Sequence, residues 1–443
     1  MAIVGEDYGE GSSIMQERTY AFAMKAQMWL LDPRPDHTKI VTMIEHGFSL
    51  SEASKTPIFF MMRVRGCHAT GEFIAQDNVS PEFTPENHVT PNREAEKIIL
   101  PPYVFDQERE KVDDRLPSAV RFIVENNLNE CFPGECTDLG IITCGGSYNT
   151  LIRALERQGL SDVFGNSSIP IYVMNVTYPV VPEEIVSFCL GKTHVLLLEE
   201  GQPAYIEPEL HAILRKRDIQ TKILGKDVFP PAGEYTAQVL LTGLTRFLDV
   251  SNNANLKPLL SLDEVEALRS PLETFDQNRL VEVLPARPSG LCTGCPERPL
   301  FSAIKQLQTE QGPFHISSDI GCHSFATLAP FNLGNTIMGY GLSLASSSSI
   351  RKTLPHKAIS IMGDGGFWHN GLSTGVVSAV FNKHDGLLII VNNGYSAATG
   401  GQDIPSMVEP NDLIASTIDA KRLEREDSIS IANACRGAGV EWI

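Results

Sequence analysis

Two short polar motifs, each directly behind an apolar run, constrain the fold of this chain most. Gly363-Asp364-Gly365-Gly366 follows a predicted strand over 358–362, and Asn392-Asn393-Gly-Tyr395 follows a predicted strand over 387–391. The segment between them predicts a helix over 371–382. In an open α/β sheet, ligands bind beyond the carboxyl ends of neighbouring strands. The two motifs therefore predict a ligand site at one edge of a parallel sheet.

The residue types at these strand ends suit a magnesium ion and a diphosphate. Mg²⁺ prefers hard oxygen ligands, usually one carboxylate with phosphate and other oxygens. Asp364 offers the carboxylate, an asparagine of the Asn392-Asn393 pair an amide oxygen, and the backbone near Tyr395 a carbonyl. The glycines let the backbone approach a diphosphate closely. The alternative interpretation is two unrelated turns, because a single Gly-Asp-Gly is common.

Strand and helix patterns alternate along most of the chain, which predicts a multi-domain α/β fold with doubly wound parallel sheets. Further strands are expected over 2–4, 28–31, 58–62, 139–143, 169–173, 194–198 and 315–320, and further helices over 147–158, 205–216, 339–349 and 429–438. We expect four segments: an α/β unit over 1–76, a Pro-rich linker over 77–130, and α/β units over 131–283 and 284–443. Because the first and last units begin and end within an αβ pattern, we expect a piece of a larger protein or assembly.

Charge and hydropathy exclude several classes of partner. The net charge of −18 argues against a nucleic-acid partner, which would require a basic surface. No apolar run approaches the ~20 residues that would cross a bilayer, and the first residues lack the basic start of a secretory signal. We therefore expect a cytoplasmic protein without a membrane segment, whose nine cysteines are thiols or metal ligands rather than disulfides.

Several further motifs carry a resemblance to a known family. They are Arg287-Pro-Ser-Gly-Leu-Cys292-Thr-Gly-Cys295-Pro-Glu-Arg298, Asp319-Ile-Gly321-Cys322, Asn393-Gly-Tyr-Ser-Ala-Ala-Thr399-Gly400-Gly-Gln402, Glu6-Asp-Tyr-Gly-Glu-Gly-Ser-Ser13, Arg63-Val-Arg65-Gly-Cys67-His68, Gly140-Ile-Ile-Thr143 and Leu198-Glu199-Glu200-Gly201. With the first two motifs, they resemble 2-oxoacid:ferredoxin oxidoreductases, most closely the indolepyruvate type in its α-subunit or fused form. The likeness covers nearly the whole chain.

The resemblance implies a thiamine-diphosphate (ThDP) binding fold. Its units would be a partial pyrimidine-type domain over 1–76, a transketolase C-terminal-like domain over 131–283 and a diphosphate-type domain over 284–443. The implied cofactor-binding residues are Gly321, Cys322, Gly363, Asp364, Gly365, Gly366, Asn392, Asn393, Tyr395, Thr399 and Gly400, and the implied Mg²⁺ ligands are Asp364, Asn393 and Tyr395.

The reaction that the resemblance implies is ThDP-dependent oxidative decarboxylation of a 2-oxoacid. The substrate would be an arylpyruvate such as indolepyruvate, the product an acyl-CoA, and ferredoxin the electron acceptor. The implied partners are the 2-oxoacid, CoA, ferredoxin, and further domains or a subunit with the glutamate that activates the cofactor; an oligomer is expected. The alternatives are a non-oxidative ThDP-dependent decarboxylase or lyase, and a non-catalytic fragment.

Cys292, Cys295 and Cys322 form a second candidate site. Thiolates at Cys-x-x-Cys spacing bind metals or iron-sulfur clusters, and in pyruvate- and oxoglutarate-type relatives the equivalent cysteines hold a [4Fe-4S] cluster with a fourth cysteine further along. Here Cys435 is the only later cysteine, within an ordinary helical pattern. A cluster and buried structural thiols stay equally open, with zinc as a third interpretation.

Three weaker candidates complete the sequence analysis. His323 and His369 flank the motifs and could move protons or form hydrogen bonds. Glu199-Glu200 is expected to be a solvated strand end. Cys67-His68 is not expected to be a nucleophile, because no base lies nearby in the sequence. No catalytic residue is assigned.

Overall fold

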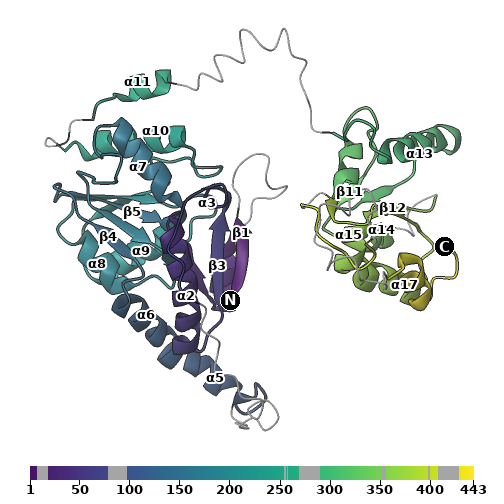
Figure 1. Ribbon diagram of the computed structural model, residues 1–443, viewed down its shortest axis with the longest axis horizontal. Helices are drawn as coiled ribbons and strands as arrows, with labels where there is room; N and C mark the ends of the chain where they lie inside the picture. Colours follow the sequence, from purple (N-terminus) through teal and green to yellow (C-terminus); the bar gives the residue numbers. More distant parts are fainter. Residues whose placement is uncertain are drawn as a thin grey trace. The chain divides into compact units, whose positions relative to one another are not determined.

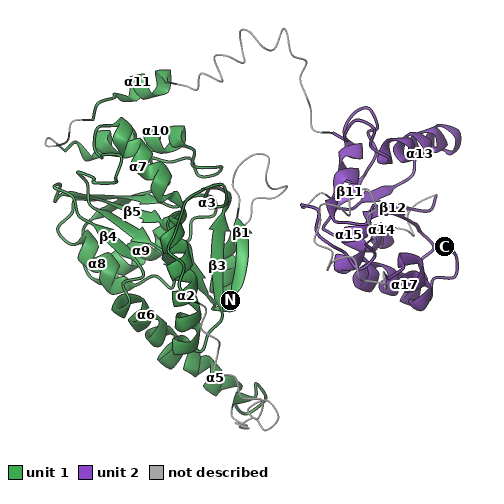
Figure 2. Ribbon diagram, viewed as in Figure 1, with its two compact units in different colours: residues 1–283 green, residues 284–443 purple. Residues whose placement is uncertain are grey.

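The computed structural model describes residues 1–6, 18–77, 97–253, 256, 258–268, 290–350, 356–397, 400–407 and 429–443. These residues form two compact units, 1–283 and 284–443 (Figure 2). In both units, helices pack against largely parallel sheets, so the predicted α/β fold is confirmed. None of the helices in the described part of the chain is long and apolar enough to cross a membrane.

Unit 1 contains two sheets (Figure 1). The first, in spatial order, is β1 (Ala2–Glu6), β3 (Ile58–Arg63), β2 (Trp29–Leu31) and β7 (Val176–Tyr178), with only β7 antiparallel to its neighbour. The second is β4 (Glu130–Phe132), β6 (Ile171–Met174), β5 (Leu139–Cys144), β8 (His194–Leu198) and β9 (Lys222–Leu224), with only β4 antiparallel. Because β7 comes from the predicted middle domain, segments 1–76 and 131–283 share a sheet. Their separation into two domains stays a prediction.

Helices pack on the two faces of the second sheet, and unit 1 contains further helices as well. In chain order, the helices described in this unit are α1 (Thr19–Ala26), α2 (His37–Ser54), α3 (Val64–Cys67), α5 (Val104–Glu110), η2 (Lys111–Arg115), α6 (Leu116–Glu125), η3 (Gly145–Ser147), α7 (Tyr148–Arg157), α8 (Pro182–Cys189), α9 (Ile206–Lys216), α10 (Ala237–Ser251) and α11 (Leu262–Ala267). Successive side chains of β5 point to opposite faces. Ile141 therefore packs with α7 and α10, and Ile142 packs with α8 and α9.

A helical run from α5 to α6 lies within the predicted linker 77–130, and the sequence analysis did not predict it. Ala119 and Ile123 are buried on one face of α6 and pack against α2 and the first sheet. Their spacing of four residues places them on the same side of a helix. Pro117 lies in the first turn of α6, directly after the π-helical segment η2. Tertiary packing therefore makes a helix of a proline-rich segment.

Buried ion pairs join the two sheets of unit 1 and contradict one prediction. Glu199 and Glu200 follow β8 and were expected to be solvated, but each is only 2% exposed. Glu199 accepts hydrogen bonds from the Ile206 N–H at the start of α9 and from Arg18. Glu200 pairs with Arg63 at 2.6 Å. Both cations are remote in sequence, so local pattern could not reveal them.

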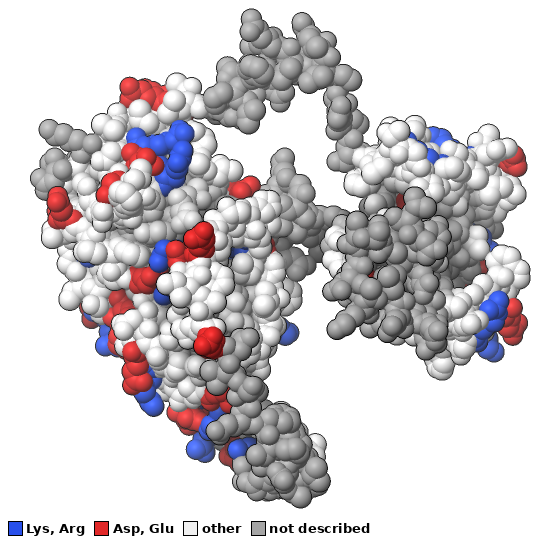
Figure 3. Space-filling view, in the orientation of Figure 1, with Lys and Arg blue, Asp and Glu red and all other residues white. Residues whose placement is uncertain are grey.

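The outer surface of unit 1 carries charges of both signs. On the face that Figure 3 shows, acidic and basic side chains are interspersed over this unit. Exposed pairs such as Lys55 and Asp114, 3.1 Å apart, belong to this surface. Such pairs contribute little to stability because water screens them.

Unit 2 is built on one fully parallel sheet. Its strands, in spatial order, are β11 (Thr336–Ile337), β10 (Ile316–Ser318), β12 (Ile359–Gly363) and β13 (Leu387–Val391). Its helices are α13 (Glu297–Gln311), η5 (Cys322–Thr327), α14 (Ser343–Ile350), α15 (Asp364–Gly366), η7 (Phe367–Val377), α16 (Ser378–Phe381) and α17 (Ile431–Gly437). Ile361 packs toward α13 on one face, and Met362 toward α14 and η7 on the other. The helical run after β12 begins at Asp364, earlier than predicted.

Candidate cofactor site

The two motifs meet at the carboxyl edge of the unit 2 sheet. Gly363 at the end of β12 is paired with Val391 at the end of β13. The Asp364 carboxylate accepts hydrogen bonds from the backbone N–H groups of Asn393, at 2.9 Å, and Gly394, at 2.7 Å. It also accepts the Gly365 N–H at 2.9 Å. One buried side chain therefore holds both strand-end loops together.

A cavity of about 50 Å³ opens above this edge. The predicted residues that line it are Gly321, Cys322, Gly363, Asp364, Gly365, Gly366, Asn393 and Tyr395. Lining residues that were not assigned to the site from the sequence include Glu297, His323, Tyr340 and Ser396. Asn392 and Gly400 are exposed and are not in the lining. Thr399 lies outside the described residues.

Two glycines of the first motif are required by close contacts. A Cβ added at Gly365 would lie 2.3 Å from the Tyr340 hydroxyl, and one at Gly366 would lie 2.2 Å from an Asp319 carboxylate oxygen. Real Cβ atoms do not come this close to such neighbours. Any larger residue would push Tyr340 or Asp319 away and change the cavity wall.

Asp319 holds a backbone segment next to the site. It belongs to the motif Asp319-Ile-Gly321-Cys322, but no role was predicted for it. Its carboxylate is fully buried and accepts the N–H groups of Gly341, at 2.7 and 2.8 Å, and Leu342, at 3.2 Å. Burial raises the pKa of Asp319 to about 6, although these hydrogen bonds oppose the rise. Asp319 lies within the predicted strand 315–320, and that motif was the local signal for it; in the structure it directly follows β10.

Two other polar side chains in the lining have atoms without a partner. His323 Nε2 and Glu297 Oε2 are buried and accept or donate no hydrogen bond. Burial lowers the pKa of His323 to about 4 and raises the pKa of Glu297. The His323 ring lies against Gly321, 2.7 Å from the Cβ position that glycine lacks. His369, the other predicted histidine, is exposed and packs on Tyr340 at 5.1 Å between ring centroids.

The donor set of this cavity fits Mg²⁺ with a diphosphate. A carboxylate has about four acceptor positions, and Asp364 uses three of them for backbone N–H groups, which leaves one for a cation. Asn393 Oδ1 accepts only a long bond, 3.3 Å, from the Tyr395 N–H. These are hard oxygen ligands of the kind that Mg²⁺ prefers. The N-terminus of the helical run at Asp364 is also a favourable place for an anionic group.

The three candidate cluster cysteines lie in one neighbourhood but do not form a metal site by themselves. Cys295 and Cys322 pack against the core on the α13 side of the sheet, whereas Cys435 packs in the core on the opposite face. Arg298 holds the Cys-x-x-Cys loop by donating to the carbonyls of Cys292, at 3.0 Å, and Leu291. Among the described residues, no three His, Cys, Asp or Glu side chains are grouped as a metal site. The cluster stays a prediction, and Cys435 is not positioned as its fourth ligand.

Comparison with known proteins finds a matching domain family and several similar chains. Residues 319–443 match the family described as thiamine pyrophosphate enzyme, C-terminal TPP binding domain; thiamine pyrophosphate is another name for ThDP. The indolepyruvate oxidoreductase subunit IorA of Methanothermobacter thermautotrophicus is 24% identical over 453 residues, covering 100% of this chain and 65% of the relative. IorA of Thermococcus kodakarensis is 26% identical, covering 91% and 61%. The chain is similar to IorA subunits along most of its length. The predicted resemblance is thus confirmed.

The chain spans less than two thirds of the length of the IorA subunits that it matches. A solved 2-oxoglutarate:ferredoxin oxidoreductase from Magnetococcus marinus aligns at 14% identity and a TM-score of 0.32, covering 50% of this chain and 42% of that one. That likeness is too weak to carry an argument. The family match contains Asp319 and both motifs, whereas Glu297 precedes it.

Burial of Asp319 predicts a pH effect on stability. Its folded-state pKa of about 6 lies above the ordinary value of 3.8, so the folded state binds more protons between these pH values. The stability that Asp319 contributes is therefore present below pH 3.8 and is lost as the pH rises through 6, by up to about 3 kcal/mol. In Asp319→Asn, this pH-dependent part of the free energy of unfolding should be absent. Urea unfolding of both proteins at several pH values measures it. Parallel pH profiles of the two proteins would contradict it.

Proposed function

We propose that this chain is the ThDP-binding part of a 2-oxoacid:ferredoxin oxidoreductase. It would oxidatively decarboxylate a 2-oxoacid, an arylpyruvate such as indolepyruvate, to the acyl-CoA, with electrons passed to ferredoxin. The observation that carries the proposal is the Asp364 carboxylate, which joins the Gly-Asp-Gly and Asn-Asn motifs within a matched ThDP domain. Similarity to IorA along the whole chain supports the oxidative reaction and the indolepyruvate class.

The residues at the sheet edge have distinct tasks in this proposal. Asp364, Asn393 and the Tyr395 carbonyl hold Mg²⁺, and Gly365 and Gly366 admit the diphosphate. When bound, ThDP supplies the electron sink for decarboxylation of the 2-oxoacid. Asp319 keeps the Gly341–Leu342 backbone in place beneath the site. The chain thus contributes binding and orientation around the reacting centre.

Cys292, Cys295 and Cys322 are proposed to bind a [4Fe-4S] cluster that accepts the electrons. The packing of Cys295 and Cys322 against the same core supports this proposal. A fourth ligand is required and would come from another part of the assembly. The same assembly is proposed to be an oligomer in the cytoplasm, with a partner subunit or further domains that supply the cofactor-activating glutamate.

The test is anaerobic oxidation of indolepyruvate with CoA and a viologen dye. We expect the purified chain alone to be inactive and activity to appear when candidate partner subunits are added. Without positioned acid-base assistance, the rate should fall by about 10²- to 10⁴-fold. Dye reduction by the chain alone would contradict the expected need for a partner.

The same assay separates the non-oxidative alternative. A decarboxylase or lyase would release CO₂ from the 2-oxoacid without dye reduction or dependence on CoA. Its anaerobically purified complex would also contain no iron. The described residues contain no group of three possible metal ligands. The iron content of the complex is therefore the measurement that separates the two reactions.

A further inference from the structure

The cofactor cavity contains a buried acidic side chain that the proposed function does not use. Glu297 is the first residue of α13 and is 8% exposed, and its Oε2 atom has no hydrogen-bond partner. A buried charge without a partner is costly, so such groups are normally paired or bound to a ligand. The neighbouring Arg298 is engaged with the Leu291 and Cys292 carbonyls.

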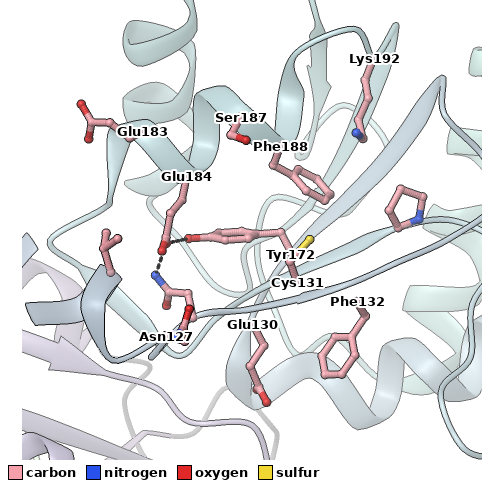
Figure 4. Close-up of a pocket in the computed structure, with 13 residues that line it drawn as sticks. Asn127, Glu130, Cys131, Phe132, Tyr172, Glu183, Glu184, Ser187, Phe188 and Lys192 are labelled. Carbon is pink, nitrogen blue, oxygen red and sulfur yellow. Dashed lines mark hydrogen bonds between the residues drawn. The ribbon is translucent and has the colours of Figure 1, made fainter. Parts of the chain in front are cut away.

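A cavity in unit 1 provides a contrast. It measures about 810 Å³ and lies beside β4, β6 and α8 (Figure 4). Its Glu184 carboxylate accepts hydrogen bonds from the Tyr172 hydroxyl and from Asn129 Nδ2. The Lys192 ammonium lies 4.8 Å from the centre of the Phe188 ring. No side chain lining it has a buried, unpartnered nitrogen or oxygen atom. A buried carboxylate oxygen without a hydrogen-bond partner therefore occurs in the lining of the cofactor cavity but not in that of this unit 1 cavity.

The charges around the cofactor cavity are of one sign. Among its described lining residues, Asp364 and Glu297 are the acidic side chains, and there is no Lys or Arg. A ligand of this cavity must therefore bring positive charge to two places.

These two acidic side chains reach the cavity from different elements. Asp364 is bonded to the Asn393–Gly394 loop, on the β13 side. Glu297 instead belongs to α13, which packs with Ile316 of β10 on one face of the sheet. The N-terminal end of the α13 dipole favours a carboxylate at Glu297. The cavity thus has a metal side and a second acidic side.

We propose that Glu297 contacts the cofactor and that its carboxylate is the counter-ion of the cationic thiazolium ring. The inference rests on the proposed ThDP function. ThDP carries an anionic diphosphate, matched by Mg²⁺ at Asp364, and a permanently cationic ring, which matches the second acidic side. Glu297 is therefore a binding residue that recognises the charge of the ring rather than the diphosphate.

The test compares ThDP with an analogue whose ring nitrogen is replaced by carbon, so that the ring is neutral. Calorimetry with Mg²⁺ measures the affinity of the full chain for each ligand. Loss of one charge-assisted contact in Glu297→Gln should weaken ThDP binding by about tenfold or more. Affinity for the neutral analogue should stay unchanged or rise. Glu310→Gln, at the exposed end of the same helix, is the matched control and should change neither affinity.

Each outcome decides between the inference and the proposed function. Equal loss for both ligands, or no loss for either, in Glu297→Gln would overturn the role of Glu297. Absence of ThDP binding by the wild-type chain would overturn the proposed function and the inference with it. Glu297→Asp keeps the charge and should retain the preference for ThDP over the analogue; a variant that loses this preference while its melting temperature is unchanged would also overturn the inference.

Discussion

Replacement of Asp364 by alanine is expected to weaken Mg²⁺-dependent binding of ThDP by about 100-fold or more, while the sheet of unit 2 stays folded. The carboxylate is the candidate metal ligand, and it also accepts the N–H groups of Asn393 and Gly394. Each hydrogen bond to a charged group contributes about 1.5–3 kcal/mol, and 1.4 kcal/mol corresponds to a factor of ten. The variant loses the metal ligand and these contacts together. Calorimetric titration with ThDP in the presence and absence of Mg²⁺ measures the effect.

A matched control is available on the same sheet. Asp385 is exposed in the turn before β13, so Asp385→Ala should leave ThDP affinity and its Mg²⁺ dependence unchanged. Asp364→Asn should keep more of the local structure than Asp364→Ala, because its amide oxygen can still accept a backbone N–H. It should still bind Mg²⁺ weakly, because it lacks the charge that attracts the cation. Unchanged affinity in Asp364→Ala would refute the assignment of this residue as a metal ligand.

The two strand-end motifs of the site could be predicted, because each follows from a local pattern of residues. A short apolar run followed by Gly363-Asp364-Gly365 or Asn392-Asn393 indicates a buried strand with a polar end. Parallel strands then bring both ends to one edge. The bond from the Asn393 N–H to Asp364 realises this expectation in atomic detail. The strand over 387–391 was predicted with the bounds that the structure has.

The rest of the site depends on contacts that no local pattern contains. Asp319 becomes important because the Gly341–Leu342 backbone is folded onto it. Glu297 becomes notable only because α13 buries it beside the cavity without a partner. In the same way, β7 pairs with β2, from which it is far apart in the sequence, and so joins the sheet formed by the first 76 residues. Such features are set by tertiary packing rather than by periodicity.

The second large effect is expected in unit 1, where Arg63→Met should lower the free energy of unfolding by about 3–5 kcal/mol. The Arg63 guanidinium donates to both carboxylate oxygens of Asp32, at 2.8 and 3.2 Å, and to Glu200 at 2.6 Å. All three side chains are buried. Methionine fills similar space but leaves two acidic groups in an apolar environment without their cation. Urea unfolding of both proteins measures the difference.

The pH dependence of this loss gives a sharper test than its size. In the wild type, burial raises the pKa of Asp32 and the Arg63 charge opposes the rise. Without Arg63 the pKa of Asp32 should rise further, so the variant's folded state keeps its proton to higher pH. A group whose pKa is raised on folding stabilises at low pH and loses this contribution as the pH rises. The stability gap between wild type and Arg63→Met should therefore widen from pH 5 to pH 8.

An exposed ion pair in the same unit supplies the control for this argument. Lys55 pairs with Asp114 at 3.1 Å, but its side chain is 58% exposed. Water already solvates both charges, so Lys55→Met should cost no more than about 1 kcal/mol. A loss in Arg63→Met as small as that in Lys55→Met, or a gap that narrows toward pH 8, would mean that Asp32 and Glu200 do not depend on Arg63. The junction between the two sheets would then be held by apolar packing and the β2–β7 pairing rather than by its buried charges.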